Sequence, residues 1–292
     1  MFIARNDLWG TLSMPGRGGQ NQVSQDQPQK HDLTPFFEPE GVAVIGSFRE
    51  GVFGGYVVVK SLLKSGYKGN IYPINPGAYK EVLGFKVYPS LQEIPAKADL
   101  ALLMINARNV PGVIRNCAET GIKSIILVAD GFAERDAEGA RLQDEVVHLA
   151  KALGVRIIGP NTAGIANAIN GFNPCPYDAG YYQLKKGTVS ICSQTGMINP
   201  QAYPYGDLDY GISKICDFGN KCDLDECDFL EYLENDATTR VISVYVESVR
   251  DGKRFLEVCK RVAAKKPLLV LKLGATEEGA RASASHTGSL AI

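Results

Sequence analysis

Residues 41–64 read GVAVIGSFREGVFGGYVVVKSLLK and predict a buried strand, a Gly-rich turn and a helix in that order. Residues 42–45 form an apolar run of strand length, and residues 54–64 carry apolar side chains at helical spacing. Small residues in the turn let backbone N–H groups approach an anion at the helix start. This order is typical of the first βα unit of a parallel sheet, with a candidate phosphate site at its turn.

The alternation of strands and helices continues along the chain and predicts two domains. In the first domain, residues 36–178, we expect further strands at 70–74, 99–105, 124–129 and 156–158 and helices at 110–120 and 137–153. In the second domain, residues 179–292, we expect strands at 188–192, 212–216, 241–246 and 268–273, and helices at 225–234, at 252–264 and from near Thr195. The predicted fold class is α/β, with two doubly wound parallel sheets. No covering helix follows the last expected strand, so we expect the second domain to be truncated at its C-terminus.

Composition narrows the class of protein. Residues 16–29 are rich in Gly, Gln, Asn and Pro, which predicts a disordered N-terminal extension over residues 1–35. The 31 basic and 32 acidic residues give a net charge of -1, which provides no electrostatic reason to expect nucleic acid or a membrane surface. No apolar run is long enough to cross a bilayer, and the N-terminus lacks a signal pattern, so we expect a cytoplasmic protein.

The seven cysteines do not predict a metal site. Cys216, Cys222 and Cys227 lie close together in the sequence, but no C-x-x-C occurs and no His lies near them. We expect reduced thiols, several of them buried.

A nicotinamide cofactor is disfavoured at the first turn. The turn does not follow the G-x-G-x-x-G spacing, and the second expected strand is followed by Asn75-Pro76-Gly77 rather than by an acid that could hold a ribose. A turn that only packs remains an alternative at this point.

A second candidate anion site lies at Cys192-Ser193-Gln194-Thr195-Gly196. Ser193 can cap the following helix, and Gly196 lets a ligand or partner come close. An ordinary capped turn is the alternative interpretation.

Among the three histidines, His286 is the candidate nucleophile. His31 lies in the N-terminal extension, and His148 lies within an expected helix, where a packing or surface role is simplest. His286 is surrounded by Ser, Thr, Gly and Ala, so a bulky substrate or a phosphate can approach it. Neutral imidazole is a competent nucleophile near pH 7, and Glu247, at the end of an expected strand, can orient it. The alternative interpretation, that His286 is a loop histidine without a catalytic role, remains open at this point.

Taken together, these segments resemble the nucleoside-diphosphate-forming (NDP-forming) acyl-CoA synthetases, which include the ADP-forming acetyl-CoA synthetases, and more distantly the α subunit of succinyl-CoA synthetase. The resemblance runs from about residue 36 to the C-terminus. The strings that carry it are AVIG (43–46), YPINP (72–76), DGFAE (130–134), IGPNTAGIAN (158–167), SQTG (193–196), GNKCDLD (219–225) and ASHTGSLA (284–291).

The resemblance implies a Rossmann-like CoA-binding domain followed by a flavodoxin-like, succinyl-CoA-ligase-like domain. The residues implied at CoA are Ser47 and Gly54 at its phosphates, Asn75 and Pro76 at the rim, and Lys80 in place of a basic residue usual near Gly77. The residues implied at phosphate are Ser193, Gln194, Thr195, Gly196 and Asn161. His286 is implied as the phosphohistidine, and Glu247 as the acid that steadies it.

The implied reaction converts acyl-CoA, phosphate and ADP into acid, CoA and ATP through an acyl phosphate and a phosphohistidine. The acid would be a short organic acid, and ADP or ATP with Mg would bind only at a partner ATP-grasp domain or subunit in a hetero- or homo-oligomer. One departure is Asp217, which stands where a small hydroxyl residue is usual and would weaken anion binding. The main alternative is a non-catalytic CoA-sensing or regulatory module; a protein acyltransferase and an oxidoreductase rank lower.

Overall fold

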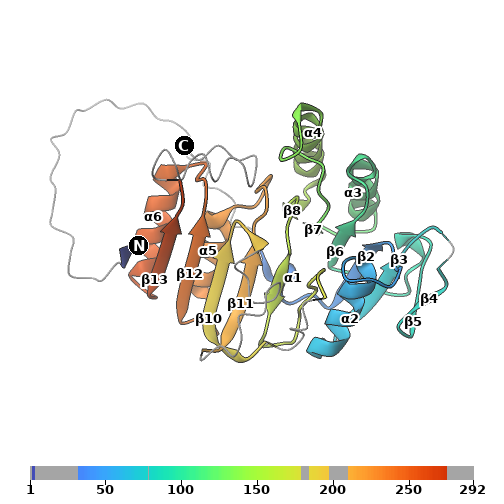
Figure 1. The fold of residues 1–292 in the computed structure, drawn as a ribbon, viewed down its shortest axis with the longest axis horizontal. Helices are drawn as coiled ribbons and strands as arrows, with labels where there is room; N and C mark the ends of the chain where they lie inside the picture. Colours follow the sequence, from blue (N-terminus) through green and yellow to red (C-terminus); the bar gives the residue numbers. More distant parts are fainter. Residues whose placement is uncertain (1, 4–31, 78, 179–183, 197–209, 275–292) are drawn as a thin grey trace.

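The computed structural model describes residues 2–3, 32–77, 79–178, 184–196 and 210–274, and it forms two sheets that stand side by side (Figure 1). The parallel strands and their intervening helices confirm the α/β class. The expected disorder of residues 1–35 and the helix expected from Thr195 fall largely outside the described residues.

The first sheet is wholly parallel, with the order β3-β2-β6-β7-β8. Its strands are β2 (Gly41–Gly46), β3 (Asn70–Ile74), β6 (Leu100–Met104), β7 (Ser124–Leu127) and β8 (Arg156–Ile158). Val42 and Val44 belong to the same core cluster as helix α2 (Gly55–Ser65), whereas Ala43 and Ile45 share a second cluster with helices α3 (Val110–Glu119) and α4 (Ala137–Leu153). This alternation explains why the strands read as continuous apolar runs: both faces of the sheet are covered.

The second sheet has the order β1-β13-β12-β10-β11-β9. Its parallel centre consists of β10 (Lys186–Ser193), β11 (Ile212–Asp217), β12 (Val241–Val246) and β13 (Leu268–Lys272), with α5 (Glu226–Asn235) and α6 (Gly252–Ala263) packed against it. The antiparallel edge strands are β1 (Phe2–Ile3) and β9 (Ile165–Asn167). Strand β9 was not expected, and it takes the chain into the second sheet before the predicted boundary at residue 178.

Helix ends follow from local sequence. The Asp136 carboxylate accepts the Gly139 N–H at the start of α4, and Asp225 and Asp228 form a reciprocal capping box at the start of α5. Helix α2 differs because its N-cap residue is Gly54, with φ of 123°, and no side chain caps its N–H groups. The first turn of α2 therefore has backbone donors available to a ligand.

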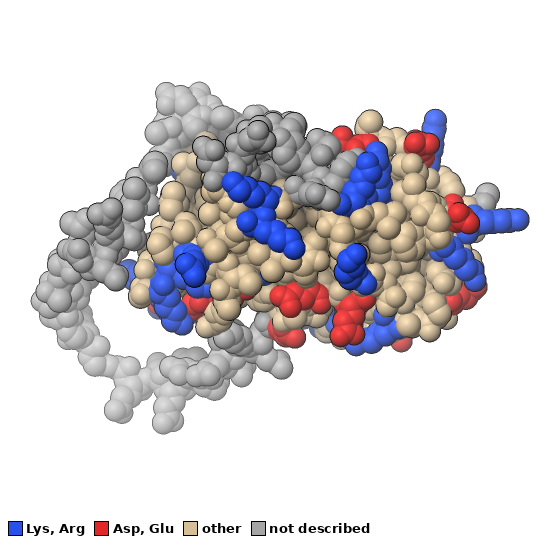
Figure 2. Space-filling view, turned by 90° about the horizontal axis from the view of Figure 1, so that it is seen from below, with Lys and Arg blue, Asp and Glu red and all other residues tan. Residues whose placement is uncertain are grey.

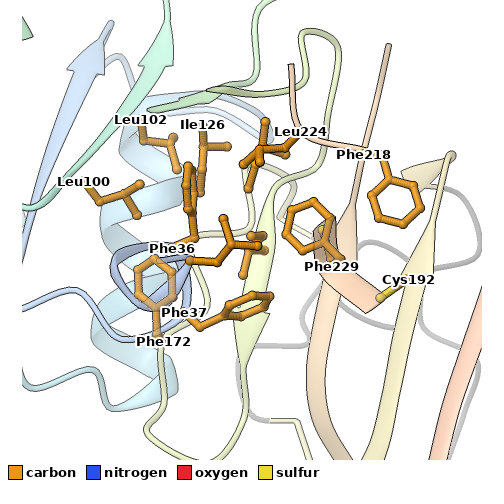
Figure 3. Close-up of a cluster of buried hydrophobic side chains, with 14 of the residues drawn as sticks. Phe36, Phe37, Leu100, Leu102, Ile126, Phe172, Cys192, Phe218, Leu224 and Phe229 are labelled. Atoms are coloured by element: carbon orange, nitrogen blue, oxygen red, sulfur yellow. The ribbon is translucent and has the colours of Figure 1, made fainter. Parts of the chain in front are cut away.

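A single hydrophobic cluster joins the two sheets (Figure 3). The short helix α1 (Thr34–Phe37) places Phe36 and Phe37 between them, and both side chains are fully buried. The Phe37 ring stacks on Tyr232 at 4.6 Å and meets the edge of Phe229 at 6.1 Å between centroids. These aromatic contacts connect α1 to α5 of the second domain, and the cluster that contains them includes Leu100 and Leu102 of the first sheet, so the two domains share a core.

The remaining elements are short. The hairpin β4 (Glu81–Val82) and β5 (Phe85–Lys86) follows β3, and 3-10 turns lie at Leu91–Glu93 and Ala107–Asn109. Basic and acidic side chains are interspersed over the face shown in Figure 2. Within the described ranges, none of the helices has the length and apolar character needed to cross a membrane.

Candidate functional site

The first crevice lies at the topological switch point of the first sheet. Strands β2 and β6 are neighbours, but their chains leave in opposite directions along the sheet, so a gap opens beyond their carboxyl ends. A cavity of about 660 Å³ occupies this position. Its walls come from the turn after β2, from the segments after β6 and β7, and from Tyr177. The lining residues are Ser47, Arg49, Glu50, Gly51, Phe53, Gly54, Gly55, Met104, Ile105, Asn106, Val128, Ala129, Asp130, Asn161 and Tyr177.

Two glycines shape the phosphate side of this cavity. Gly54 has a positive φ that side chains rarely adopt, and a Cβ at Gly55 would lie 2.9 Å from the Ser47 carbonyl oxygen. Both therefore have to be glycine for the turn to close onto the start of α2. The Ser47 hydroxyl lies 3.1 Å from the Tyr79 hydroxyl. This wall offers N–H groups, a hydroxyl and the Arg49 guanidinium, which suits a phosphate ester.

Asn75 holds the turn beside the cavity in place without lining the cavity itself. Its side-chain amide donates to the Gly46 carbonyl at 2.7 Å and accepts the Gly77 N–H at 2.8 Å, so it ties the ends of β2 and β3 together. Asn75, Pro76 and Lys80 are not among the residues that line the cavity, and Pro76 and Lys80 are exposed. Their contact with CoA stays a prediction.

Asn161 connects this crevice to a neighbouring one. It has a φ of 58° and lines both the first cavity and an adjoining cavity of about 420 Å³. The second cavity is bounded also by Asp130, Glu134 and Arg135. The Glu134 carboxylate accepts the N–H groups of Gly131 and Phe132 at 2.6 and 3.0 Å, which fixes this wall.

The second candidate site lies at the switch point of the second sheet, between β10 and β12. The Gln194 side-chain oxygen accepts the N–H groups of Glu247 and Ser248 at 2.9 and 3.0 Å, and its nitrogen donates to the Ser248 hydroxyl at 3.1 Å. The structure thus brings together two segments that the sequence singled out 53 residues apart. Gln194 makes a positioning contact here; its contact with phosphate stays a prediction.

Glu247 is buried and held in place by its neighbours. The residue is only 2 % exposed, and its Oε1 accepts a hydrogen bond from the Tyr245 hydroxyl at 3.2 Å. Lys272 donates to the Glu247 carbonyl at 2.8 Å, and Lys221 donates to the Ser248 carbonyl at 2.7 Å. Lys221 is also paired with the buried Glu226 carboxylate at 3.0 Å, so both lysines hold the backbone at the end of β12 in place. Sequence reasoning missed both, because a lysine pattern alone does not distinguish a buried ammonium from a solvated one.

Asp217 joins the two candidate sites. Its Oδ2 accepts the Ala163 N–H at 2.6 Å, and its Oδ1 accepts the Gly219 N–H at 3.1 Å. Burial raises the pKa of this carboxyl to about 6, against the lowering effect of those hydrogen bonds, and the charge of Glu247 adds to the rise. A Cβ at Gly196 would lie 3.2 Å from Oδ2, so the carboxylate sits beside the predicted phosphate loop. Both oxygens of this carboxylate accept backbone N–H groups, so the side chain has a structural role at this position.

The positions of the remaining predicted residues are partly described. Ser193 is fully buried, and its hydroxyl donates to the Thr195 carbonyl at 2.5 Å. His286 lies outside the described residues, so its role stays a prediction. The cavity of about 660 Å³ beyond β2 and β6 is also lined by residues that the sequence did not single out, among them Arg49, Phe53 and Tyr177. What marks Phe53 and Tyr177 is that their aromatic rings are exposed, and exposure cannot be read from a single sequence.

Within the described residues, the cysteines and the potential metal ligands form no further site. Cys117, Cys192 and Cys222 are buried, and burial raises the pKa of each thiol to about 12. Such thiols are protonated and unreactive at neutral pH. Across the described part of the chain, no group of three or more His, Cys, Asp or Glu side chains is placed to hold a metal ion.

Comparison with known proteins assigns both halves. Residues 40–168 match a family model described as a CoA binding domain, and residues 186–292 match one described as a succinyl-CoA ligase like flavodoxin domain. The fold thus consists of a CoA-binding domain followed by a succinyl-CoA-ligase-like flavodoxin domain. The chain belongs to the NDP-forming acyl-CoA synthetase family, as the resemblance in the sequence indicated.

Individual relatives agree with this assignment. The α subunit of acetate–CoA ligase [ADP-forming] I from Pyrococcus furiosus is 39% identical over 265 residues, covering 89% of this chain and 56% of that protein. The 4-hydroxybutyrate–CoA ligase [ADP-forming] of Nitrosopumilus maritimus is 35% identical, with 88% of this chain and 37% of that protein covered. An acetyl-coenzyme A synthetase from Candidatus Korarchaeum cryptofilum, solved with phosphate and ADP, superposes with a TM-score of 0.81 at 37% identity, covering 89% of this chain and 56% of that one. The chain therefore spans about half the length of the α-subunit relatives it matches.

Proposed function

We propose that this chain is the CoA-binding, phosphohistidine-carrying part of an acid–CoA ligase, with His286 as the phosphoryl carrier and Glu247 as its positioning acid. CoA would lie in the crevice between β2 and β6, with its phosphates at Ser47, Gly54 and the first turn of α2. The inorganic phosphate would lie beside Thr195 and Gly196. The cytoplasm is the compartment we propose.

The chemistry follows from the family. A phosphate oxygen attacks the thioester carbon of a short acyl-CoA, the C–S bond breaks, and CoA leaves with a proton. A ring nitrogen of His286 then attacks phosphorus, and the P–O bond to the acid breaks. A terminal oxygen of ADP finally takes the phosphoryl group and the P–N bond breaks. The last step needs an ATP-grasp partner, where ADP and Mg would bind.

One observation carries this proposal: hydrogen bonds connect the segments of the second site to one another and to the segment that follows Asn161, which lines the crevice between β2 and β6. Gln194 ties the predicted phosphate loop to Glu247, and the Asp217 carboxylate ties the end of β11 to Ala163, two residues beyond Asn161 on the wall of the CoA crevice. These bonds support a thioester in the crevice and a phosphate beside Thr195 and Gly196 being held on one connected framework. Preorganised donors at both positions provide the charge stabilisation that acyl and phosphoryl transfer require.

The test is covalent labelling. Acyl-CoA with ³²P-phosphate, or a labelled acyl phosphate alone, should label His286 as an acid-labile, alkali-stable phosphoramidate. His286→Ala should abolish the label, and Glu247→Gln should reduce it by roughly 10–1000-fold. His148→Ala serves as the matched control, because that ring lies on α4 and bonds the Asp144 carbonyl. The labelling is repeated with an ATP-grasp partner supplied.

The same samples separate the alternatives. CoA binding without any label, with or without the partner, would favour a CoA-sensing module over the ligase. Tighter binding of NAD than of CoA would overturn the assignment of the first crevice. Label that persists in His286→Ala would refute the proposed carrier.

A further inference from the structure

A buried ion pair lies beside the second candidate site. Lys221 and Glu226 are each 1% exposed, and the ammonium nitrogen lies 3.0 Å from a carboxylate oxygen. A buried ion pair contributes little net stability, because the loss of hydration offsets most of the attraction between the charges. The backbone of Lys221 also has a φ of 54°, in the left-handed region that residues with a side chain rarely adopt. Stability alone therefore does not account for a lysine at this position.

The chain segment that carries Lys221 is fastened to the wall of the CoA crevice. The Asn220 N–H donates to the Pro160 carbonyl at 2.9 Å. Gly219 packs so closely on the same residue that a Cβ there would lie 2.2 Å from the Pro160 carbonyl oxygen. The residue after Pro160 is Asn161, which lines both cavities of the first domain. The backbone of Lys221 is therefore placed by the wall of the first crevice.

The side chain of Lys221 extends from this wall to the end of β12. Its ammonium donates to the Ser248 carbonyl at 2.7 Å, directly after Glu247. The Gln194 side chain accepts the N–H groups of Glu247 and Ser248 at 2.9 and 3.0 Å. The predicted phosphate loop thus holds the N–H groups of this short segment, and Lys221 holds its last carbonyl. Glu226 is the counter-ion that keeps the ammonium in place.

We propose that Lys221 is a positioning residue that sets Glu247 and Ser248 in register with the wall of the CoA crevice. This inference rests on the proposed function, in which an acyl group passes between the two sites. Lys272 also donates to the Glu247 carbonyl, but it lies on β13, the neighbouring strand of the same sheet, so it does not connect the two sites. A misplacement of about 1 Å can lower a transfer rate by about 100-fold. Loss of Lys221 should therefore lower the rate of transfer and leave CoA binding in place.

Acyl transfer from acetyl phosphate to CoA tests this register without an ATP-grasp partner. The sulfur of CoA attacks the carbonyl carbon, the C–O bond to phosphate breaks, and the thiol proton leaves with the phosphate. Thioester absorbance gives kcat and the KM for CoA. The variant combines Lys221→Met with Glu226→Gln, so that no buried charge is left unpaired. We expect kcat to fall by about 10–100-fold, whereas the KM for CoA and the CoA affinity measured by calorimetry stay within about twofold.

The chain offers a matched control in a second buried lysine–carboxylate pair. Lys214 and Asp236 are 2.7 Å apart, and their side chains are 1% and 9% exposed. This ammonium donates to Asp236 and Thr238, which precede β12, whereas Ser248 follows it. Lys214→Met combined with Asp236→Asn should therefore leave kcat and the KM for CoA within about twofold. Urea unfolding of both double variants establishes that each assay contains folded protein.

Hydrogen–deuterium exchange measures the register independently of activity. The amides of Glu247 and Ser248 donate to Gln194, and this contact is loosened when the Ser248 carbonyl loses its donor. In the Lys221→Met, Glu226→Gln variant these two amides should exchange about 10-fold faster than in the unchanged protein. The Lys214→Met, Asp236→Asn control should leave their exchange unchanged.

The outcomes separate this inference from the proposed function. If the unchanged protein neither transfers the acyl group nor labels His286, the proposed function fails, and the catalytic role of Lys221 fails with it. If the unchanged protein is active and the folded double variant keeps its kcat, the role of Lys221 alone is refuted. A rise in the KM for CoA without a fall in kcat would refute it too, because Lys221 would then only shape the crevice. An equal loss of kcat in the control pair would refute it as a general effect of buried charge.

Discussion

Replacing Asp217 with asparagine should change how the stability of the protein depends on pH. The carboxyl is 2% exposed, and burial raises its pKa from 3.8 to about 6. An acid with a raised pKa binds its proton more tightly in the folded state than in the unfolded state. Its contribution to stability is therefore greatest below pH 3.8 and is lost as the pH rises through about 6.

The size of the effect follows from the shift. A rise from 3.8 to about 6 corresponds to about 3 kcal/mol of unfolding free energy, which the ionised carboxylate costs above pH 7 and about half of which is recovered at pH 5. Asparagine is neutral throughout, but its amide can accept from only one of Ala163 and Gly219, which costs about 1–3 kcal/mol at every pH. The stability of the variant relative to the wild type should therefore fall by about 1.5 kcal/mol from pH 7 to pH 5, and at pH 7 the variant should match or exceed the wild type.

Urea unfolding followed by circular dichroism at pH 5, 6, 7 and 8 measures this difference. Other carboxyls with raised pKa values, such as Asp225, titrate in both proteins and cancel in the comparison. Asp136→Asn is the matched control: the Arg135 side chain and the Gly139 N–H lower the pKa of that carboxyl, so its removal should leave the slope between pH 5 and 7 unchanged. A variant and a wild type with parallel pH profiles would refute the idea that Asp217 ionises at a cost in the folded protein.

Three further changes test the frame of the two sites. Phe37→Ala should lower the unfolding free energy by about 3–5 kcal/mol, measured by urea unfolding, because a fully buried ring between the sheets is removed; an effect below about 1 kcal/mol would contradict the shared core. Glu226→Gln should cost about 3–5 kcal/mol in the same assay, since the Lys221 ammonium, 3.0 Å away and 2% exposed, loses its buried counter-ion; a compensating Lys221→Met should recover part of the loss. Gln194→Ala should lower labelling of His286 by roughly 10–100-fold while CoA affinity measured by calorimetry stays within twofold, because the N–H groups of Glu247 and Ser248 lose their acceptor; a parallel loss of CoA affinity would show a general collapse instead.

Sequence reasoning located the strands and helices well where apolar periodicity is local. The bounds expected for β3, β8, β12 and α4 agree with those observed, and the turns after β2 and β10 lie at the two switch points. Strand β9 was missed because three residues, Ile165–Asn167, carry no period, and its partner β11 lies some fifty residues further along the chain. Such pairing depends on tertiary contacts rather than on local preference.

The sequence predicted which residues lie together at the second candidate site, but it did not predict which hydrogen bonds they make. That Ser193 to Gly196 and Glu247 lie together follows from the rule that parallel strand ends converge. That Gln194 uses its whole side chain to hold the backbone of β12 could not be foreseen, because an amide has the same pattern in the sequence whether it binds a ligand or a neighbouring strand. The aromatic pair at the crevice mouth was missed for a similar reason: Phe53 and Tyr177 are 124 positions apart, and only folding makes them neighbours.

The hydrophobic cluster that joins the sheets has a consequence for inheritance as well as for folding. Phe37, Phe218 and Phe229 fill one space with side chains such as Leu100 and Leu102 of the first sheet, so neither half presents a finished surface at their boundary. A gene that carried only one half would encode a protein whose aromatic side chains at this boundary are exposed to solvent, and such a surface promotes aggregation. The two halves are therefore expected to melt in a single transition.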